Sequence, residues 1–362
     1  MVFSSTSQYC GLVYGQDSHH LDHIATLCAC LDIPLIVSDE ALEQQAKRYY
    51  PQLVTFLFPY LILPQKIIES YDLILTTMPL PVFNSFFSLA KQLTNKNPLS
   101  VWCPHGNSDK GKTSFFMETL RQENAVGVYG QKMLDFLKEK KALSQACQLI
   151  SLGNYRYSFY QKHQNFYKKL IEKEVLSKLV KNQPLYLYAP TWDDHESGSS
   201  FHFAIRSLLE NLPNSINLVI KLHPNTLLAE DMAVKRLIWK YETEPNVLFL
   251  EDFPLIYPLL DIADLYIGDT SSIGYDFLAF NKPMFFLKTQ GVNPLQDLHV
   301  CGTVLQKDDL PLIYTKIQES LATDTSLFAK KRKDIYAYTF QEVNPFEQIL
   351  PQLHTLYKRY VS

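Results

Sequence analysis

The chain has 362 residues, of which 46% are hydrophobic and 20% are charged. This composition is typical of globular proteins rather than disordered chains, and the length fits two domains better than one. The 34 basic and 37 acidic residues give a formal net charge of -3. This balance gives no support for nucleic-acid binding, because nucleic-acid-binding proteins usually carry a basic excess.

In the first half of the chain, short apolar runs rich in β-forming residues alternate with longer amphipathic stretches. This alternation predicts parallel βαβ units. Strands are expected at Gly11–Tyr14, Pro34–Val37, Leu53–Phe58, Leu73–Thr76, Leu99–Cys103, Ala125–Tyr129 and Gln148–Leu152. Helices are expected at Leu21–Leu31, Val82–Leu93 and Gln131–Lys140. The most hydrophobic stretch, Leu53 to Leu63, contains Pro59, and we interpret it as a buried strand followed by a turn.

The second half repeats this pattern after a charged, lysine-rich stretch at 159–181, which we interpret as the crossover between two domains. Strands are expected at Leu185–Ala189, Asn217–Leu222, Val247–Leu250, Leu265–Gly268 and Met284–Leu287. Helices are expected at Phe203–Glu210, Leu227–Tyr241 and Ile273–Phe280, and a last helix is expected after Pro345. The sequence therefore predicts an α/β protein with two Rossmann-like parallel-sheet domains, over 1–157 and 158–343.

Several common site classes are excluded or disfavoured by the motifs. The sequence contains no G-x-G-x-x-G, no G-x-x-x-x-G-K-[ST] and no G-x-S-x-G, which argues against a dehydrogenase, a P-loop enzyme and a serine hydrolase. None of the six cysteines forms a C-x-x-C pair, so we expect buried free thiols. His19 and His23 have the i, i+4 spacing of a metal pair, but no H-E-x-x-H accompanies them. We expect no metal and no other cofactor.

The location is predicted from what the sequence lacks. The stretch from Met1 to Tyr9 has neither the basic nor the apolar region of a signal peptide. No run approaches the roughly 18 apolar residues of a membrane span. We expect a cytoplasmic protein, with the inner face of a membrane as a further place where it could act.

Four polar segments follow predicted strands, and ligands of open α/β sheets bind beyond the carboxyl ends of strands. The first segment combines an imidazole, two glycines and several polar side chains in one loop. Glycines allow a close approach of the backbone to a ligand, and histidine can act as a general base near neutral pH. This loop consists of His105, Gly106, Asn107, Ser108, Asp109, Lys110 and Gly111.

The second and third segments offer hydroxyl, aromatic and cationic groups. Thr191 and Trp192 follow the first strand of the second half, and they supply a hydroxyl and a stacking face. Lys221 and His223 end the next strand, and alternation points them to the same side if the strand extends that far. A cation and an imidazole at such a place suit a phosphate or a developing oxyanion.

The fourth segment runs from a strand through small hydroxyl residues into a helix. It contains Asp269, Thr270, Ser271 and Ser272, with Asp276 further on. Serines are favoured helix N-caps, and a helix N-terminus offers backbone N–H groups and a positive dipole end. This arrangement predicts a phosphate site.

Together these segments resemble the CDP-glycerol glycerophosphotransferase family, which comprises polymerases and primases of teichoic-acid-like polymers. The resemblance runs from about residue 100 to 290, and its motifs occur in the family's order. They read H-G at 105–106, A-P-T-W at 189–192, K-L-H-P at 221–224, D-T-S-S at 269–272, Y-D-F-L at 275–278 and K-P at 282–283.

The resemblance implies a GT-B fold with an interdomain cleft and a C-terminal helix, residues 344–362, that packs back on the N-terminal domain. It implies transfer of glycerol phosphate, or a similar polyol phosphate, from a CDP-alcohol to an acceptor hydroxyl, with His105 and His223 as catalytic residues. The first domain would hold the acceptor with the loop around His105, and the second the donor. The donor-binding set would be Lys221, Thr191, Asp269, Thr270, Ser271, Ser272 and Asp276.

Three departures from the family keep alternatives open. Asp193 stands where many members have arginine, Thr270 stands where they have tyrosine, and the loop after His105 lacks their lysine-rich sequence. One alternative is a GT-B glycosyltransferase or epimerase that uses a UDP-sugar. Another is a GT-B-shaped binding protein without turnover.

The expected partners follow from this interpretation. They are a nucleotide-diphosphate donor, with a CDP-alcohol favoured, and an acceptor that is a polyol, a glycan or a lipid-linked intermediate. We also expect that peripheral contact with a membrane is possible for this protein, and we expect no binding of nucleic acid.

Overall fold

In the computed structural model, the chain forms two units, each of them built from segments that are separate in the sequence. The first unit comprises Met1–His105, Phe115–Lys162 and Tyr338–Ser362, and the second comprises Gly106–Ser114 and His163–Ala337. The described residues are 8–16, 18–107, 115–193, 198–223, 226, 232–251, 253–289, 298–323 and 326–360.

The first unit contains a seven-stranded parallel sheet with the order β3-β2-β1-β4-β5-β6-β7. Its core part has the order of a doubly-wound nucleotide-binding sheet. Most of its strands are fully buried apolar runs, as expected for parallel strands that are covered on both faces. The strands are β1 (Tyr9–Val13), β2 (Leu35–Val37), β3 (Thr55–Leu57), β4 (Leu73–Thr76), β5 (Leu99–Trp102), β6 (Ala125–Val128) and β7 (Gln148–Ser151).

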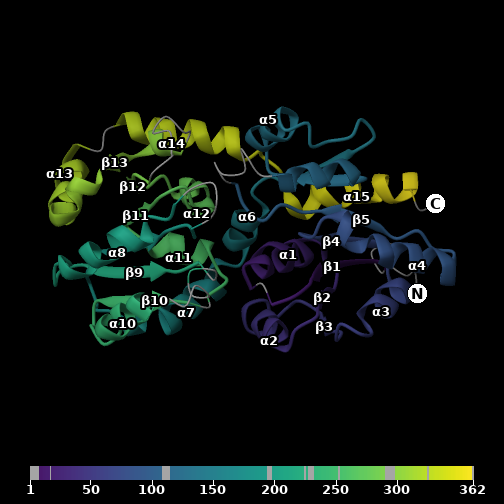
Figure 1. Cartoon of the computed structure of the whole chain (residues 1–362), viewed down its shortest axis with the longest axis horizontal. Coiled ribbons are helices and arrows are strands. Elements are labelled where there is room, and N and C mark those ends of the chain that lie inside the picture. The colour runs from purple at the N-terminus through teal and green to yellow at the C-terminus, as the bar shows by residue number, and fades with distance from the viewer. Residues whose placement is uncertain are drawn as a thin grey trace. The chain divides into compact units, whose positions relative to one another are not determined.

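Helices connect these strands (Figure 1), and several of them carry buried apolar side chains. The last helix of the chain, α15, belongs to this unit and packs against α1 and β7, where the Gln352 amide bonds both backbone groups of Ser151. The helical elements are α1 (Ser18–Leu31), α2 (Glu40–Tyr49), α3 (Leu63–Ser70), η1 (Leu80–Phe83), α4 (Asn84–Thr94), η2 (Phe115–Gln122), α5 (Gln131–Glu139), α6 (Tyr155–Lys162) and α15 (Pro345–Tyr360).

The second unit contains a six-stranded parallel sheet with the order β10-β9-β8-β11-β12-β13. Strands β9 and β10 extend it to one side of β8, and β11, β12 and β13 extend it to the other (Figure 1). The strands are β8 (Leu185–Ala189), β9 (Asn217–Lys221), β10 (Val247–Leu250), β11 (Leu265–Gly268), β12 (Met284–Leu287) and β13 (Thr303–Leu305).

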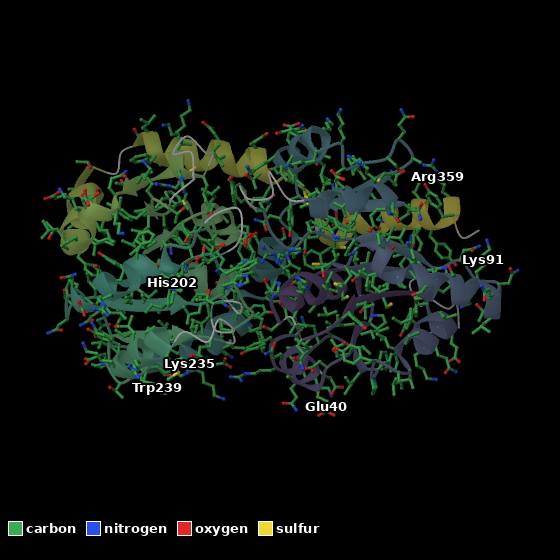
Figure 2. The ribbon with its side chains drawn as sticks, viewed as in Figure 1. Glu40, Lys91, His202, Lys235, Trp239 and Arg359 are labelled. Carbon is green, nitrogen blue, oxygen red and sulfur yellow. The ribbon has the colours of Figure 1, made fainter. Side chains whose placement is uncertain are left out.

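The helices of the second unit cover an aliphatic and aromatic core built on β8, β9 and β11. On the outer side of α10, Lys235 and Trp239 point away from the sheet (Figure 2), and Trp239 is 59% exposed. The helical elements are α7 (Gln164–Glu174), η3 (Leu176–Lys178), α8 (Phe201–Glu210), α10 (Met232–Tyr241), α11 (Tyr257–Ile262), α12 (Ser272–Phe277), η4 (Leu278–Phe280), η5 (His299–Cys301), η6 (Lys307–Leu312), α13 (Ile313–Thr323) and α14 (Ser326–Thr339).

The expected strands are confirmed to within two residues at each end, and so is the α/β class with two parallel sheets. The interpretation of 53–63 as a buried strand is wrong in one respect. Strand β3 lies at the edge of its sheet, its three residues are partly or fully exposed, and the turn after it exposes Tyr60, Leu61 and Ile62. The short strand β13 was not expected, because its three residues carry too little periodicity to mark it.

Candidate functional site

The predicted donor segments of the second unit meet where the strand order of its sheet reverses. Strands β8 and β11 are neighbours, and Ala189 at the end of β8 is aligned with Gly268 at the end of β11. The carboxyl ends of such a strand pair form a topological switch point, which is where open α/β sheets bind ligands. Thr191 follows β8 and Asp269 follows β11, so both lie at this edge.

Asp269 joins the two loops through a fully buried carboxylate. Its Oδ1 accepts a hydrogen bond from the Thr191 N–H at 2.8 Å. Its Oδ2 accepts from the N–H of Ser200 at 2.9 Å and from the Ser200 hydroxyl at 2.7 Å. A buried carboxylate is tolerated only when its oxygens are bonded. Within the described residues Asp269 therefore fixes the Thr191 loop, and its role toward a donor stays a prediction.

Two serines that the sequence analysis did not single out complete this network. The Ser199 hydroxyl donates to the Thr191 carbonyl at 2.5 Å, and the Ser200 hydroxyl lies 2.9 Å from the hydroxyl of Tyr188. Asp193, the residue that departs from the family pattern, accepts from the Ser199 N–H at 3.3 Å. The only sequence signal for this pair was its place directly before an amphipathic helix, where serine is a frequent cap.

The second and third segments come together through their aromatic rings. The Trp192 indole stacks with the His223 imidazole, with ring centroids 5.9 Å apart and planes at 29°. Lys221 is the last residue of β9 and is buried, with 8% of its surface exposed. His223 lies just beyond the strand and is half-buried. Pro224, the last residue of this motif, lies outside the described residues.

The fourth segment forms the predicted strand-to-helix turn. Ser271 is the N-cap of α12, and its hydroxyl accepts from the Ile273 N–H at 3.4 Å. Thr270 is 2% exposed, and its hydroxyl has no hydrogen-bond partner among the described residues. Because α12 has only six residues, the phosphate site predicted at this turn would depend on hydroxyl and N–H groups more than on a helix dipole.

Part of the first segment lies against this turn. Gly106, which belongs to the second unit, has φ +131°, and a Cβ there would lie 2.9 Å from the Cβ of Ser272. Such a backbone conformation and such a close approach both favour glycine. Asn107 is buried, and its Nδ2 has no partner in the described part of the chain. The remaining candidates of this loop, Ser108, Asp109 and Lys110, lie outside the described residues.

Two further motif residues pack elements together. The Tyr257 hydroxyl donates to Asp276 at 2.9 Å, which joins α11 to α12 and leaves Asp276 only 4% exposed. The Lys282 ammonium donates to the carbonyls of Asp261 and Ala263, at 2.6 and 2.8 Å, at the end of α11. These contacts give both residues a structural role, and donor binding by Asp276 stays a prediction.

His105 lies in the first unit, directly beyond the end of β5, and its side chain is exposed. Its ring packs near two imidazoles of α1, with centroid distances of 4.8 Å to His20 and 6.2 Å to His19. The surrounding protein atoms, followed by the charge of His19, lower the pKa of His105 to about 4. From the sequence, His19 was expected only as a weak candidate for a metal ligand, and its packing near His105 was not predicted because no motif links α1 to the loop after β5. Among the described residues no group of His, Cys, Asp or Glu could hold a metal ion.

Comparison with known proteins agrees with the resemblance found in the sequence. Residues 139–290 match the sequence model of CDP-Glycerol:Poly(glycerophosphate) glycerophosphotransferase. The teichoic acid glycerol-phosphate primase of Bacillus spizizenii is 33% identical over 114 residues, which make up 30% of this chain and 26% of that protein. The matched segment thus spans about a quarter of this curated relative.

Solved structures share the fold at low sequence identity. The wall teichoic acid polymerase TagF has a TM-score of 0.65 at 13% identity, over 98% of this chain and 89% of that chain. Anabaena Alr3699/HepE in complex with UDP-glucose has a TM-score of 0.58 at 16% identity, over 96% of this chain and 99% of that chain.

These likenesses confirm the GT-B fold class with its two Rossmann-like sheets. No helix in the described part of the chain is both long and apolar enough to cross a membrane. The motifs at Thr191, Lys221 and Asp269 lie inside the matched segment. The resemblance is therefore confirmed: residues 139–290 of this chain are similar to the CDP-glycerol:poly(glycerophosphate) glycerophosphotransferase family.

Proposed function

We propose that this protein is an enzyme that transfers glycerol phosphate, or a similar polyol phosphate, from a CDP-alcohol to an acceptor hydroxyl during synthesis of a teichoic-acid-like polymer. One observation carries the proposal. The family's motif residues, Thr191, His223 and the Ser271–Ser272 turn, follow strands β8, β9 and β11 around the switch point of the second sheet, and these three strands lie within the family match.

The donor's diphosphate would lie at the turn before α12. Ser271 and Ser272 offer hydroxyl and backbone donors there, and Thr191 is held beside them by Asp269. The Lys221 cation at the end of β9 would balance the phosphate charge. The Thr270 hydroxyl is buried without a partner among the described residues, and a bound ligand would satisfy it.

The chemistry is attack by the acceptor oxygen on the β-phosphorus of the donor. A new oxygen–phosphorus bond forms, the bond from the β-phosphorus to the bridging oxygen breaks, and CMP leaves. His105 would take the proton of the acceptor hydroxyl, for which its lowered pKa keeps it neutral at pH 7. His223 would stabilise the charge that develops on the phosphates.

The two halves of the chain would divide this work. Residues 1–157 would bind the acceptor and residues 158–343 the donor, with 344–362 supporting the acceptor half. The acceptor would be a polyol, a glycan or a lipid-linked intermediate, and the reaction would take place on the cytoplasmic side.

A membrane contact is supported by the turn after β3. Tyr60, Leu61 and Ile62 are 46%, 96% and 44% exposed, and such adjacent apolar side chains insert into a lipid interface. Sedimentation with anionic lipid vesicles would test this contact, with loss of binding expected for Leu61→Glu. The matched control is Leu312→Glu, at another exposed leucine, and equal binding of both variants would contradict the contact.

A glycosyltransferase or epimerase that uses a UDP-sugar is the second candidate, because Anabaena HepE shares the fold and its structure contains UDP-glucose. A binding protein without turnover is the third, and it rests on Asp193. Thermal unfolding in the presence of CDP-glycerol, UDP-glucose and CMP separates these candidates, since a ligand of the folded state raises the melting temperature. The largest shift is expected with CDP-glycerol, and a shift with UDP-glucose alone would overturn the proposal.

A further inference from the structure

Three imidazoles gather at the carboxyl edge of the first unit's sheet. His19 and His20 lie in the first turn of α1, which follows β1, and His105 follows β5. The ring centroids of His20 and His105 are 4.8 Å apart, and those of His19 and His20 are 4.0 Å apart. His20 thus lies between the other two rings in this contact chain.

His20 is also fixed from the sheet. Its Nδ1 lies 3.1 Å from the hydroxyl of Thr77, which is buried just beyond the end of β4. Strands β4 and β5 are paired, with Thr76 aligned with Trp102. The residue that holds His20 and the strand that carries His105 therefore belong to the same rigid sheet edge.

We propose that His20 is a positioning residue for His105: Thr77 holds the His20 ring, and this ring keeps the His105 imidazole in one orientation and shields one side of it from water. The proposal rests on the proposed function in so far as His105 acts as the base. It goes beyond that function because it assigns a role to a residue outside the family motifs.

The charges around the cluster favour neutral imidazoles. Burial, then the charges of His105 and His19, lower the pKa of His20 to about 2. One turn further along α1, His23 is buried with its Nδ1 3.1 Å from the Tyr129 hydroxyl, and its pKa is also lowered, chiefly by burial. The uncharged His20 ring can therefore lower the pKa of His105 only by shielding it from water, which is the first cause that acts on His105 and comes before the charge of His19.

The nearby carboxylate of Asp22 does not offset this effect. It accepts from Arg156 at 2.9 Å and from the Tyr50 hydroxyl at 2.7 Å, all three being buried. Its charge is thus matched within this network. The arrangement differs from a triad in which a carboxylate orients the base and stabilises its protonated form.

Two readouts test the proposal in the full chain. In an NMR titration of histidine ring signals, His20→Ala is expected to raise the pKa of His105 by about one pH unit or more, toward the ordinary value near 6.5. The acid limb of the kcat/KM pH profile should move up by the same amount, and kcat should fall roughly tenfold with KM for the donor unchanged. The His105 signal is assigned by its loss in His105→Ala.

Further variants keep the test clear of misfolding. Thr77→Val leaves every imidazole in place and removes only the partner of His20, so a smaller shift in the same direction is expected. His202→Ala, at an exposed histidine on α8 (Figure 2), should change neither readout. An unshifted His105 titration in folded His20→Ala and Thr77→Val would overturn the proposal. Full turnover in His105→Ala would instead overturn the base assignment, and the titration would still report on His20.

Discussion

The two sheets present different chemistry at equivalent edges. In the second unit, the switch point between β8 and β11 is filled by a buried carboxylate that accepts three hydrogen bonds and by hydroxyl groups around it. In the first unit, the corresponding edge beyond β1, β4 and β5 carries the imidazoles of His20 and His105, whose pKa values are lowered by the surrounding protein atoms and by neighbouring imidazoles. In the proposed transfer, the first of these edges would bind the donor's phosphates and the second would accept the proton of the acceptor hydroxyl.

Among the substitutions considered, removal of the His105 imidazole should lower turnover the most. His105→Ala is expected to lower kcat roughly a hundredfold or more, the typical size of a general-base contribution, with donor affinity nearly intact. Steady-state turnover and calorimetric donor binding measure the two quantities. Wild-type turnover in this variant would mean that the imidazole edge takes no part in the chemistry.

His223→Ala should affect both turnover and donor binding, because in the proposed function His223 lies at the edge that would bind the donor's phosphates. We expect turnover to fall roughly tenfold to a hundredfold and donor binding to weaken several-fold, as for the loss of a charge-stabilising group. The same two assays apply, with His202→Ala as the matched control. If His223→Ala lost turnover but bound the donor like the wild type, His223 would have the same kind of role as His105. The proposed difference between the two sheet edges would then be wrong.

Asp269→Asn tests the carboxylate network and should have the smallest effect on kcat. The substitution replaces one carboxylate oxygen by an NH2 group, so one of the N–H or O–H groups that bond Asp269 loses its acceptor. We expect the free energy of unfolding to fall by about 1–3 kcal/mol. Donor affinity should weaken with it, because Thr191 loses its anchor. Chemical denaturation and calorimetry measure these effects. Asp193→Asn, at an exposed side chain that accepts a 3.3 Å bond from Ser199, is the control and should change stability little.

The sequence predicted the fold and the second edge well, because both depend on local pattern. Apolar runs at regular spacing marked the strands, and polar residues after them marked the strand ends that meet at a switch point. Short motifs such as the one that begins at Asp269 carried enough signal to reveal the resemblance to the glycerophosphotransferase family.

Contacts between distant residues could not be predicted in this way. Ser200 reaches Asp269 across 69 positions of sequence and His20 reaches Thr77 across 57, and no spacing rule links such pairs. The sequence also could not show that Asp276 bonds Tyr257, since an acidic side chain in a capped helix resembles a ligand group until its partner is known.

Product analysis tests the central claim most directly. The protein is incubated with CDP-glycerol and, separately, with UDP-glucose, each with a polyol-phosphate acceptor, and the released nucleotides are separated and quantified. We expect acceptor-dependent release of CMP from CDP-glycerol and little release of UDP from UDP-glucose. In His105→Ala the release of CMP should be abolished or nearly so. Release of UDP without CMP, or binding of CDP-glycerol with no acceptor-dependent release of CMP, would contradict the central claim.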